Sequence, residues 1–415
     1  MHGTDRVDGK NGRSLMPSFA QRLNGLDVSP TIAVTQRARV LRAEGHDVIS
    51  LSIGEPDFPT PPEAIEAAHA AALSGDTKYP PIVGAPALVS AIRAKFQREN
   101  ELTFAPNEIT IANGAKQIIY NAIMATVDPG NEIVIPAPYW VAYELVTRLA
   151  GGVPVIVTCP QETGFRLKPE VLEAAITPKT RWVLLNFPNN PTGAAITPAE
   201  MAALAEVMRR HPHVWIMCDD IYEHLLYDGF VYRTMAAVAP DLRDRILTIS
   251  GVSKSYAMTG WRVGFAGGPS PLIKAMNNMQ SQATSGVAGI AQAAAAAALN
   301  GDPALLAERA AIYAARRDFV VSALQSAPGL TCHKPEGAFY VFPSVAGLLG
   351  RHSAGGRLLQ TDEDVALALL EESYLAVVHG AAFGMSPYLR LSYATDEISL
   401  ARACERLVAF CETVR

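Results

Sequence analysis

Residues 250–265, SGVSKSYAMTGWRVGF, place one lysine, Lys254, among small and apolar residues. A lysine rarely occupies such surroundings, because burying an unpaired ammonium group is costly. Two runs rich in β-branched and other apolar residues, 245–250 and 261–268, flank this stretch, and we expect both to form buried strands. A loop between core strands holds a side chain on a rigid scaffold. The position therefore predicts a chemical role for the Lys254 amine.

Other candidate groups also follow expected strands. Asp219 ends the apolar run 214–219 and Tyr222 comes three residues later, although an acid at a strand end is often only a helix N-cap. Asn190 lies in the turn-rich segment 186–193, which could be a plain loop. Gly114 separates an expected strand from an expected helix, an arrangement that can bind an anion but is common in α/β proteins. Each signal is ambiguous alone.

Together, these groups match the needs of an aromatic aldehyde cofactor that carries a phosphate. Such a cofactor requires an amine for a Schiff base, an acid for its ring nitrogen, donors for its phenolic oxygen, an aromatic stacking face and a phosphate site. The corresponding candidates are Lys254, Asp219, Asn190 with Tyr222, Trp140, and Arg262 with Gly114. The combination is far more specific than any of its members.

The chain resembles the class I aminotransferases of fold type I, which use pyridoxal 5'-phosphate, and within them the bacterial aspartate aminotransferases. The resemblance runs from about Val28 to the C-terminus. The motifs that carry it are KSYAMTGWR, NFPNNPTG, DDIYEHL, APYWVAY and RLSYAT.

The resemblance implies a set of contacts to the cofactor. Lys254 would form the Schiff base and move the proton, Asp219 would pair with the ring nitrogen, and Arg262 would hold the phosphate. Asn190 and Tyr222 would bond the phenolic oxygen. Further cofactor contacts are implied for Gly114, Ala115, Lys116, Trp140 and Ser253. Many relatives carry serine or threonine where this chain has Gly251, so Ser250 or Ser253 could replace that contact, or neither.

The resemblance also implies the substrate site. Arg390 would form a two-pronged contact with the α-carboxylate, with Gly54, Trp140 and Asn190 beside it. Lys116 would contact the distal carboxylate of an acidic substrate. Alternatively, it is a second phosphate ligand or a solvated helix lysine.

The expected reaction is ping-pong transfer between amino acids and 2-oxo acids, with aspartate and 2-oxoglutarate as the substrate pair. Aminotransferases for prephenate, alanine or aromatic substrates remain alternatives. So do a carbon–sulfur lyase or cyclopropane-forming synthase on the same fold, and a regulator that binds the cofactor without catalysis.

The segment 77–84, TKYPPIVG, resembles one whose tyrosine reaches the phosphate of the neighbouring subunit. Tyr79 would make that contact, which implies a homodimer with shared active sites. Without the other motifs, the segment would be interpreted as a surface turn.

The elements that position these residues alternate along the chain. Strand-like runs separated by helix-sized spacers continue to about residue 250, which predicts an α/β fold with a mostly parallel sheet. Ligands bind at the carboxyl ends of the strands in such sheets. A smaller α+β unit is expected after it. We expect a disordered leader at 1–16, a segment at 17–60 that packs on the small domain, a large cofactor-binding domain at 61–300 and a small domain at 301–415.

Composition narrows the function classes. The 415 residues are 49% hydrophobic with a formal charge of −5 and no basic block, so we expect no nucleic-acid partner. The five cysteines are scattered without a CxxC pair, which predicts a reducing, cytoplasmic location and no metal site. The N-terminus lacks the apolar core of a secretory signal, and no apolar run reaches the roughly 20 residues of a membrane span.

Overall fold

The computed structural model describes residues 19–24 and 30–415. The leader expected at 1–16 therefore lies outside the described residues. None of the helices in the described part is long and apolar enough to cross a membrane.

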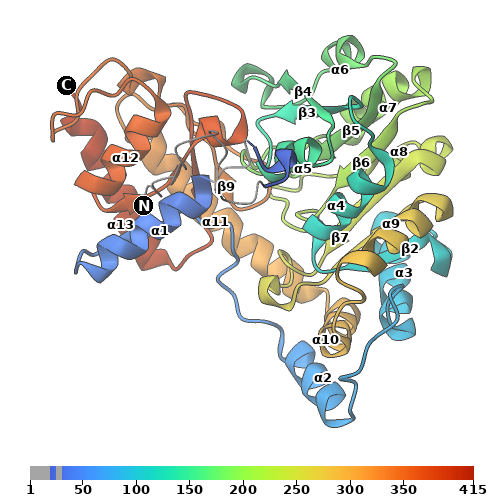
Figure 1. Cartoon of the computed structure of the whole chain (residues 1–415). Coiled ribbons are helices and arrows are strands. Elements are labelled where there is room, and N and C mark those ends of the chain that lie inside the picture. The colour runs from blue at the N-terminus through green and yellow to red at the C-terminus, as the bar shows by residue number, and fades with distance from the viewer. Residues whose placement is uncertain (1–18, 25–29) are drawn as a thin grey trace, which may run out of the picture.

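A seven-stranded sheet forms the centre of the larger part of the molecule (Figure 1). Its order is β2-β8-β7-β6-β5-β3-β4, and only β8 runs against its neighbours. The expected mostly parallel sheet is thus confirmed. Its strands are β2 (Ile109–Ala112), β3 (Glu132–Ala137), β4 (Val153–Thr158), β5 (Thr180–Asn186), β6 (Trp215–Asp219), β7 (Ile246–Gly251) and β8 (Gly264–Gly267).

Helices cover both faces of this sheet. Trp182 and Leu184 of β5 are buried with residues of α4, α5 and α9, whereas Val183 and Leu185 are buried with residues of α6, α7 and α8. Successive side chains of a strand point to opposite faces, so a strand buried on both sides must be apolar throughout. The helices are α4 (Ala115–Thr126), α5 (Ala142–Leu149), α6 (Pro169–Ala175), α7 (Pro198–Arg210), α8 (Met235–Val238) and α9 (Ser270–Ala283). The helices α2 (Pro62–Leu73), α3 (Pro86–Asn100) and α10 (Gly289–Asn300) share a further core with β2 and β8.

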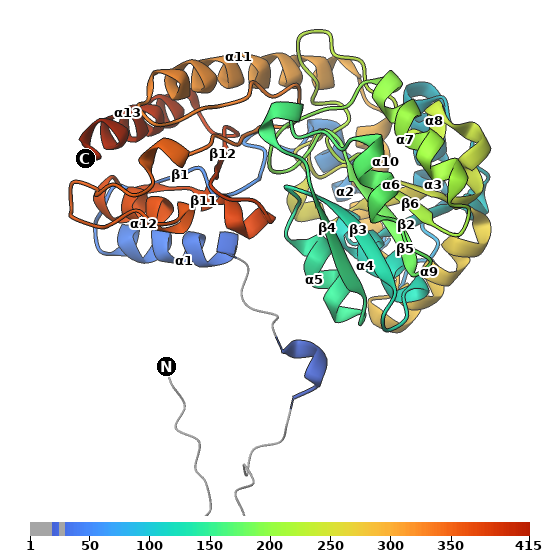
Figure 2. The same cartoon turned by 90° about the horizontal axis from the view of Figure 1, so that it is seen from above.

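A second region lies beside the sheet (Figure 2). It contains a three-stranded sheet, a two-stranded pairing between β1 and β10, and helices that include the long α11. The strands are β1 (Ile49–Ser50), β9 (Tyr340–Val341), β10 (Leu375–Ala376), β11 (Val378–His379) and β12 (Leu389–Ser392), and the helices are α1 (Pro30–Ala43), α11 (Ala304–Ser326), α12 (Asp362–Glu372) and α13 (Glu397–Thr413). The parallel pairing of β1 with β10 joins an early segment to this late region. The domain limits given above stay a prediction.

Two strands are shorter than expected. The run 261–268 forms a strand only from Gly264, because residues 259–261 form a 3-10 turn and Arg262 has a left-handed backbone with φ of 55°. In the run 337–345 only Tyr340 and Val341 belong to a named strand. Ala338 has φ of 55°, outside the range of a β-strand.

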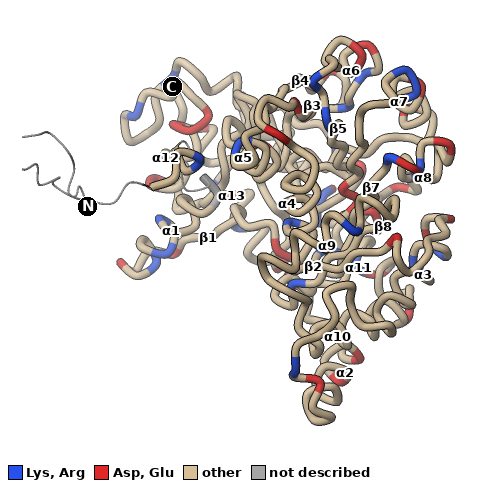
Figure 3. Tube along the Cα trace, turned by 45° about the vertical axis from the view of Figure 1, so that its right-hand side comes forward, with Lys and Arg blue, Asp and Glu red and all other residues tan. Residues whose placement is uncertain are grey.

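The strand ends bring the candidate residues together. Asn186 ends β5, Asp219 ends β6 and is its register partner, and Lys254 follows the end of β7. Gly114 follows β2 and precedes α4. Basic and acidic residues are interspersed over the trace in the view of Figure 3.

Candidate active site

A pocket of about 450 Å³ lies where these strands end. Its lining includes residues from the large sheet and, from the second region, Tyr340 and Arg390. The predicted site residues that line it are Gly54, Ala115, Lys116, Trp140, Asn190, Asp219, Tyr222, Ser253, Lys254, Arg262 and Arg390. The structure thus gathers segments that are far apart in the sequence around one space.

Lys254 extends its amine into this pocket. Its Nζ donates a 2.6 Å hydrogen bond to the carbonyl oxygen of Gly54. Burial lowers the pKa of Lys254 to about 8, and the charges of Arg390 and Arg262 act in the same direction. About a tenth of the amine is therefore neutral at pH 7, far more than for an ordinary lysine, and the neutral form is the one that acts as a nucleophile.

Asp219 is a buried carboxylate with one unused oxygen. The hydroxyl of Tyr143 donates to Oδ2 at 2.6 Å, while Oδ1 has no partner in the described part of the chain. The amide of Asn186 donates to the Asp219 backbone oxygen at 2.7 Å. Burial raises the pKa of Asp219 to about 6, partly offset by the Tyr143 hydrogen bond. A buried carboxylate oxygen without a donor is costly, so Oδ1 is suited to a cationic N–H group.

Arg390 of β12 also lines the pocket and is buried. Its guanidinium lies between two rings, 4.9 Å from the centroid of Tyr340 and 4.8 Å from that of Phe383. It donates to Oδ1 of Asn190 at 3.2 Å and to the carbonyl of Ser52. It forms no ion pair with any described residue, and its Nε has no hydrogen-bond partner there. A buried guanidinium without a carboxylate partner is suited to bind an anionic ligand.

A third group of residues forms an anion site at the start of α4. Gly114, the N-cap, has φ of 84°, and a Cβ on it would lie 2.5 Å from Nη2 of Arg262. The glycine therefore leaves room for the Arg262 side chain, which donates to the backbone oxygens of Thr259 and Asn113. The positive end of the helix dipole and the Arg262 guanidinium point to a phosphate.

Lys116 lies in the first turn of the same helix, with Nζ 4.9 Å from the centroid of the Trp140 ring. Partial loss of hydration and the neighbouring Arg262 charge lower its pKa. Neither Lys116 nor Arg262 forms an ion pair within the described ranges. Two adjacent cations without a carboxylate partner favour anion binding.

The two serines considered as substitutes at the phosphate face different surroundings. Ser253 is buried and lines the pocket. The hydroxyl of Ser250 instead donates to Oε1 of Glu223 at 2.7 Å. Glu223 also accepts from the buried Lys95 at 2.5 Å, and the two form an ion pair. Only Ser253 is thus placed for the pocket.

Two predicted site residues lie outside the pocket lining. Gly114 is adjacent to it as the N-cap of α4. Tyr79 is 97% exposed and lines no part of this pocket, so within one chain the structure does not bring it to the site.

The lining residues that were not predicted from the sequence include Tyr143, Asn186 and Tyr340. Tyr143 lies within the quoted motif APYWVAY and Asn186 within NFPNNPTG, so both had a local signal. Tyr340 lies within GAFY, and its hydroxyl is 2.8 Å from that of Tyr222. Nothing in the local sequence indicates that contact.

The pocket fits pyridoxal phosphate. It offers a partly neutral amine, a buried carboxylate oxygen without a partner, and an anion site with unpaired cations. The ring of Trp140 provides an aromatic wall. A phosphate, a pyridine nitrogen and an aldehyde are the groups that these features would satisfy.

Comparisons with known proteins agree with this site. The family described as "Aminotransferase class I and II" matches residues 46–407. The aspartate/prephenate aminotransferase of Cereibacter sphaeroides is 55% identical over 95% of this chain and 99% of its own length. The aspartate aminotransferase of Rhizobium meliloti strain 1021 is 52% identical over 95% of this chain and 96% of its own.

Solved structures show the same fold. The crystal structure of an aspartate aminotransferase from Rhizobium meliloti has a TM-score of 0.94 at 50% identity and covers 96% of this chain and 100% of its own. The Thermus thermophilus aspartate aminotransferase with maleate has a TM-score of 0.88 at 39% identity and covers 95% of this chain and 100% of its own. The site, the fold and these relatives together establish that the chain belongs to the class I and II aminotransferases, enzymes that depend on pyridoxal phosphate.

Proposed function

We propose that this enzyme is an aspartate aminotransferase that exchanges amino groups between aspartate and 2-oxoglutarate. The observation that carries the proposal is that three pocket cations besides Lys254, namely Arg262, Arg390 and Lys116, form no ion pair among the described residues. Three anionic groups would match them: the cofactor phosphate at Arg262, the substrate α-carboxylate at Arg390 and a second substrate carboxylate at Lys116. Aspartate and 2-oxoglutarate both carry that second carboxylate.

The relatives support a dicarboxylate substrate. Two of them are named for aspartate, and the Thermus enzyme was crystallised with maleate, which is itself a dicarboxylate. In the proposed assignment, Lys116 is therefore a substrate residue. As a second phosphate ligand, Lys116 would not favour acidic donors.

The same residues would hold the cofactor. Asp219 would accept from the ring nitrogen through Oδ1. Tyr222 and the free amide nitrogen of Asn190 would donate to the phenolic oxygen, because Oδ1 of Asn190 is used by Arg390. The phosphate would lie against Arg262, Ser253 and the start of α4, residues 114–116, and Trp140 would stack on the ring.

When bound, pyridoxal phosphate supplies an aldehyde that condenses with amines and a ring that withdraws electrons from the substrate α-carbon. Lys254 would hold the cofactor, and its Nζ would accept the proton from the substrate α-carbon. Asp219, by remaining ionised, would favour a positive charge at the ring nitrogen. Arg390 would bind the α-carboxylate with two parallel hydrogen bonds and so orient the bond to be broken.

Prephenate is a second candidate substrate. The Cereibacter relative, 55% identical, is named for both aspartate and prephenate. Prephenate is a 2-oxo acid with an additional carboxylate on its ring, so the same pair of cations suits it. Formation of oxaloacetate from aspartate with prephenate as the only acceptor would test this activity.

We also propose a homodimer in the cytoplasm. The exposed ring of Tyr79 supports the dimer, because a tyrosine that reaches a neighbouring subunit's phosphate must project from its own chain. The five cysteines at positions 159, 218, 332, 404 and 411 are all free thiols, which supports a reducing compartment.

The test of the donor assignment is the variant Lys116→Ser, assayed with aspartate and with alanine under saturating cofactor. A hydrogen bond to a charged group contributes roughly 1.5–3 kcal/mol, so kcat/KM for aspartate should fall about ten- to a hundredfold. Alanine has no distal carboxylate, and its kcat/KM should change far less. Equal losses for both donors would assign Lys116 to the phosphate and remove the main support for aspartate. Lys274→Ser, a lysine outside the pocket, is the matched control.

A further inference from the structure

Tyr222 has a hydrogen-bond partner that the reaction scheme above does not use. Its hydroxyl lies 2.8 Å from the hydroxyl of Tyr340, and both side chains are buried. A phenol has one proton to donate, and its oxygen can also accept. If Tyr222 donates to the cofactor, its oxygen must accept from Tyr340.

The surroundings make Tyr340 the better donor of the two. Burial raises the pKa of both phenols, that of Tyr222 well above its ordinary value, and the Arg390 charge lowers both, with only burial a larger influence at Tyr340. The Arg390 guanidinium lies 4.9 Å from the centroid of the Tyr340 ring. The more acidic phenol of a pair is the stronger donor, so this geometry favours donation from Tyr340 to Tyr222.

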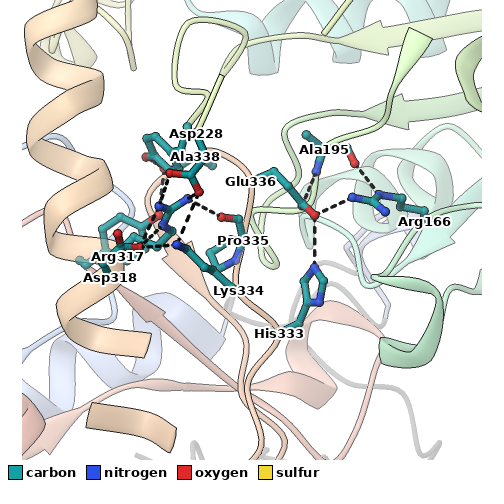
Figure 4. A network of polar contacts seen from close by, with 12 residues as sticks. Arg166, Ala195, Asp228, Arg317, Asp318, His333, Lys334, Pro335, Glu336 and Ala338 are labelled. Carbon is teal, nitrogen blue, oxygen red and sulfur yellow. Dashed lines mark hydrogen bonds and ion pairs between the residues drawn. The ribbon is translucent and has the colours of Figure 1, made fainter. Parts of the chain in front are cut away.

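The segment that precedes Tyr340 in the chain is held by several hydrogen bonds (Figure 4). In this segment, Glu336 accepts hydrogen bonds from Arg166 at 2.5 Å and from the backbone nitrogen of Ala195 at 3.2 Å. The backbone nitrogen of Ala338 donates to Leu225, three residues beyond Tyr222, at 2.9 Å. These bonds tie the segment that carries Tyr340 to the loops of the large sheet.

Gly54 provides the space for the hydroxyl. A Cβ at this glycine would lie 2.1 Å from the Tyr340 oxygen, and the carbonyl of the same glycine accepts from Lys254. The Tyr340 hydroxyl therefore occupies a place that only a glycine at position 54 leaves open.

We propose that Tyr340 is a positioning residue of the active site, whose hydroxyl donates to Tyr222 and strengthens the hydrogen bond from Tyr222 to the phenolic oxygen of the cofactor. This inference rests on the proposed role of Tyr222. It assigns to Tyr340 an effect on the cofactor that acts through a second side chain. Neighbouring hydrogen bonds in a chain strengthen one another by roughly 10–30%.

The readout is the pH titration of the visible absorption of the holoenzyme, in which the cofactor is bound to Lys254. A hydrogen bond donated to the phenolic oxygen withdraws negative charge that would otherwise stabilise a proton on the Lys254 nitrogen. Weakening that bond therefore raises the pKa of the titration. Tyr222→Phe should raise it most, and Tyr340→Phe should raise it by about a tenth to a third as much.

The double variant makes the test specific. If Tyr340 acts through Tyr222, the double variant with Tyr222→Phe and Tyr340→Phe should have the same pKa as Tyr222→Phe alone. Without the Tyr222 hydroxyl, the Tyr340 hydroxyl has no hydrogen bond to the cofactor to strengthen. The matched control is Tyr388→Phe, a tyrosine of the same region that does not line the pocket, and it should titrate as the wild type. An unchanged pKa in Tyr340→Phe would overturn the inference, as would an equal shift in the presence and absence of the Tyr222 hydroxyl.

The two proposals fail in different ways. Absence of a visible titrating band in the wild-type holoenzyme would count against the assigned cofactor site itself. A normal band with a normal response to Tyr222→Phe, but none to Tyr340→Phe, would count against the role of Tyr340 alone.

Discussion

The hydroxyl of Tyr143 donates a 2.6 Å hydrogen bond to one carboxylate oxygen of Asp219 and leaves the other oxygen without a partner. One side of the carboxylate is thereby fixed, and the free side is available to the cofactor. The pKa of Asp219 is raised to about 6 by burial, and this hydrogen bond keeps it from rising further. Tyr143 therefore helps to keep the carboxylate ionised near neutral pH.

We expect Tyr143→Phe to weaken catalysis most at low pH. Without the donor, Asp219 protonates at a higher pH, so the acidic limb of the kcat/KM profile should move upward. At pH 7 the loss should be roughly tenfold or more, as for a hydrogen bond to a charged group. Tyr139→Phe, which removes a hydrogen bond to Glu144 outside the pocket, is the control. An unmoved acidic limb in Tyr143→Phe would show that Tyr143 does not govern Asp219.

Asp220 is expected to limit stability at alkaline pH. Burial and the charge of Glu223 raise its pKa to about 7, and it accepts a 2.6 Å hydrogen bond from Tyr232. Asp220 binds its proton more tightly in the folded state than in the unfolded state. The stability that this proton contributes is fully present below about pH 4 and is lost as the pH rises through 7.

The variant Asp220→Asn cannot ionise and retains an oxygen for Tyr232. The free energy of unfolding of the variant minus that of the wild type should be larger at pH 8 than at pH 5. The increase should be on the order of 1–4 kcal/mol. Urea unfolding with saturating cofactor at both pH values measures this difference. The exposed Asp244 provides the control variant Asp244→Asn. The same relative stability of Asp220→Asn at both pH values would contradict the pKa assignment.

Shared active sites can be tested by mixing two inactive or weakened proteins. We expect Tyr79→Ala to bind cofactor more weakly and Lys254→Ala to be inactive. In a mixed dimer, one site would combine the intact Lys254 of one chain with the intact Tyr79 of the other. Activity at limiting cofactor should therefore rise above that of either protein after the two are unfolded and refolded together. No recovery, despite mixed dimers detected by affinity tags, would place Tyr79 outside the partner's site.

Much of this architecture could be predicted from the sequence because the signals are local. The apolar runs 181–187 and 214–219 indicate strands buried on both faces, and strand ends in such a sheet converge at one edge. Lys254 stands out because a lysine is unusual between core strands. The start of β8 was placed too early, because residues 259–262 adopt a turn whose left-handed Arg262 has no signal in the residue types.

Long-range contacts account for what sequence reasoning missed. The pairing of Tyr222 with Tyr340 joins residues 118 positions apart, and no local pattern specifies it. The unused Oδ1 of Asp219 and the rings on either side of Arg390 likewise depend on tertiary packing. The placement of Tyr79 at a neighbouring subunit depends on assembly and stays a prediction.

The most direct test of the account is the variant Lys254→Ala, measured by visible absorption and by transamination of aspartate with 2-oxoglutarate. The wild-type holoenzyme should be yellow and active. The variant lacks the amine that holds the aldehyde and accepts the α-carbon proton, so it should lose the Lys254-dependent band and several orders of magnitude in turnover. Lys274→Ala, a lysine outside the pocket, should keep both. Transamination by Lys254→Ala at close to the wild-type rate would contradict the central assignment.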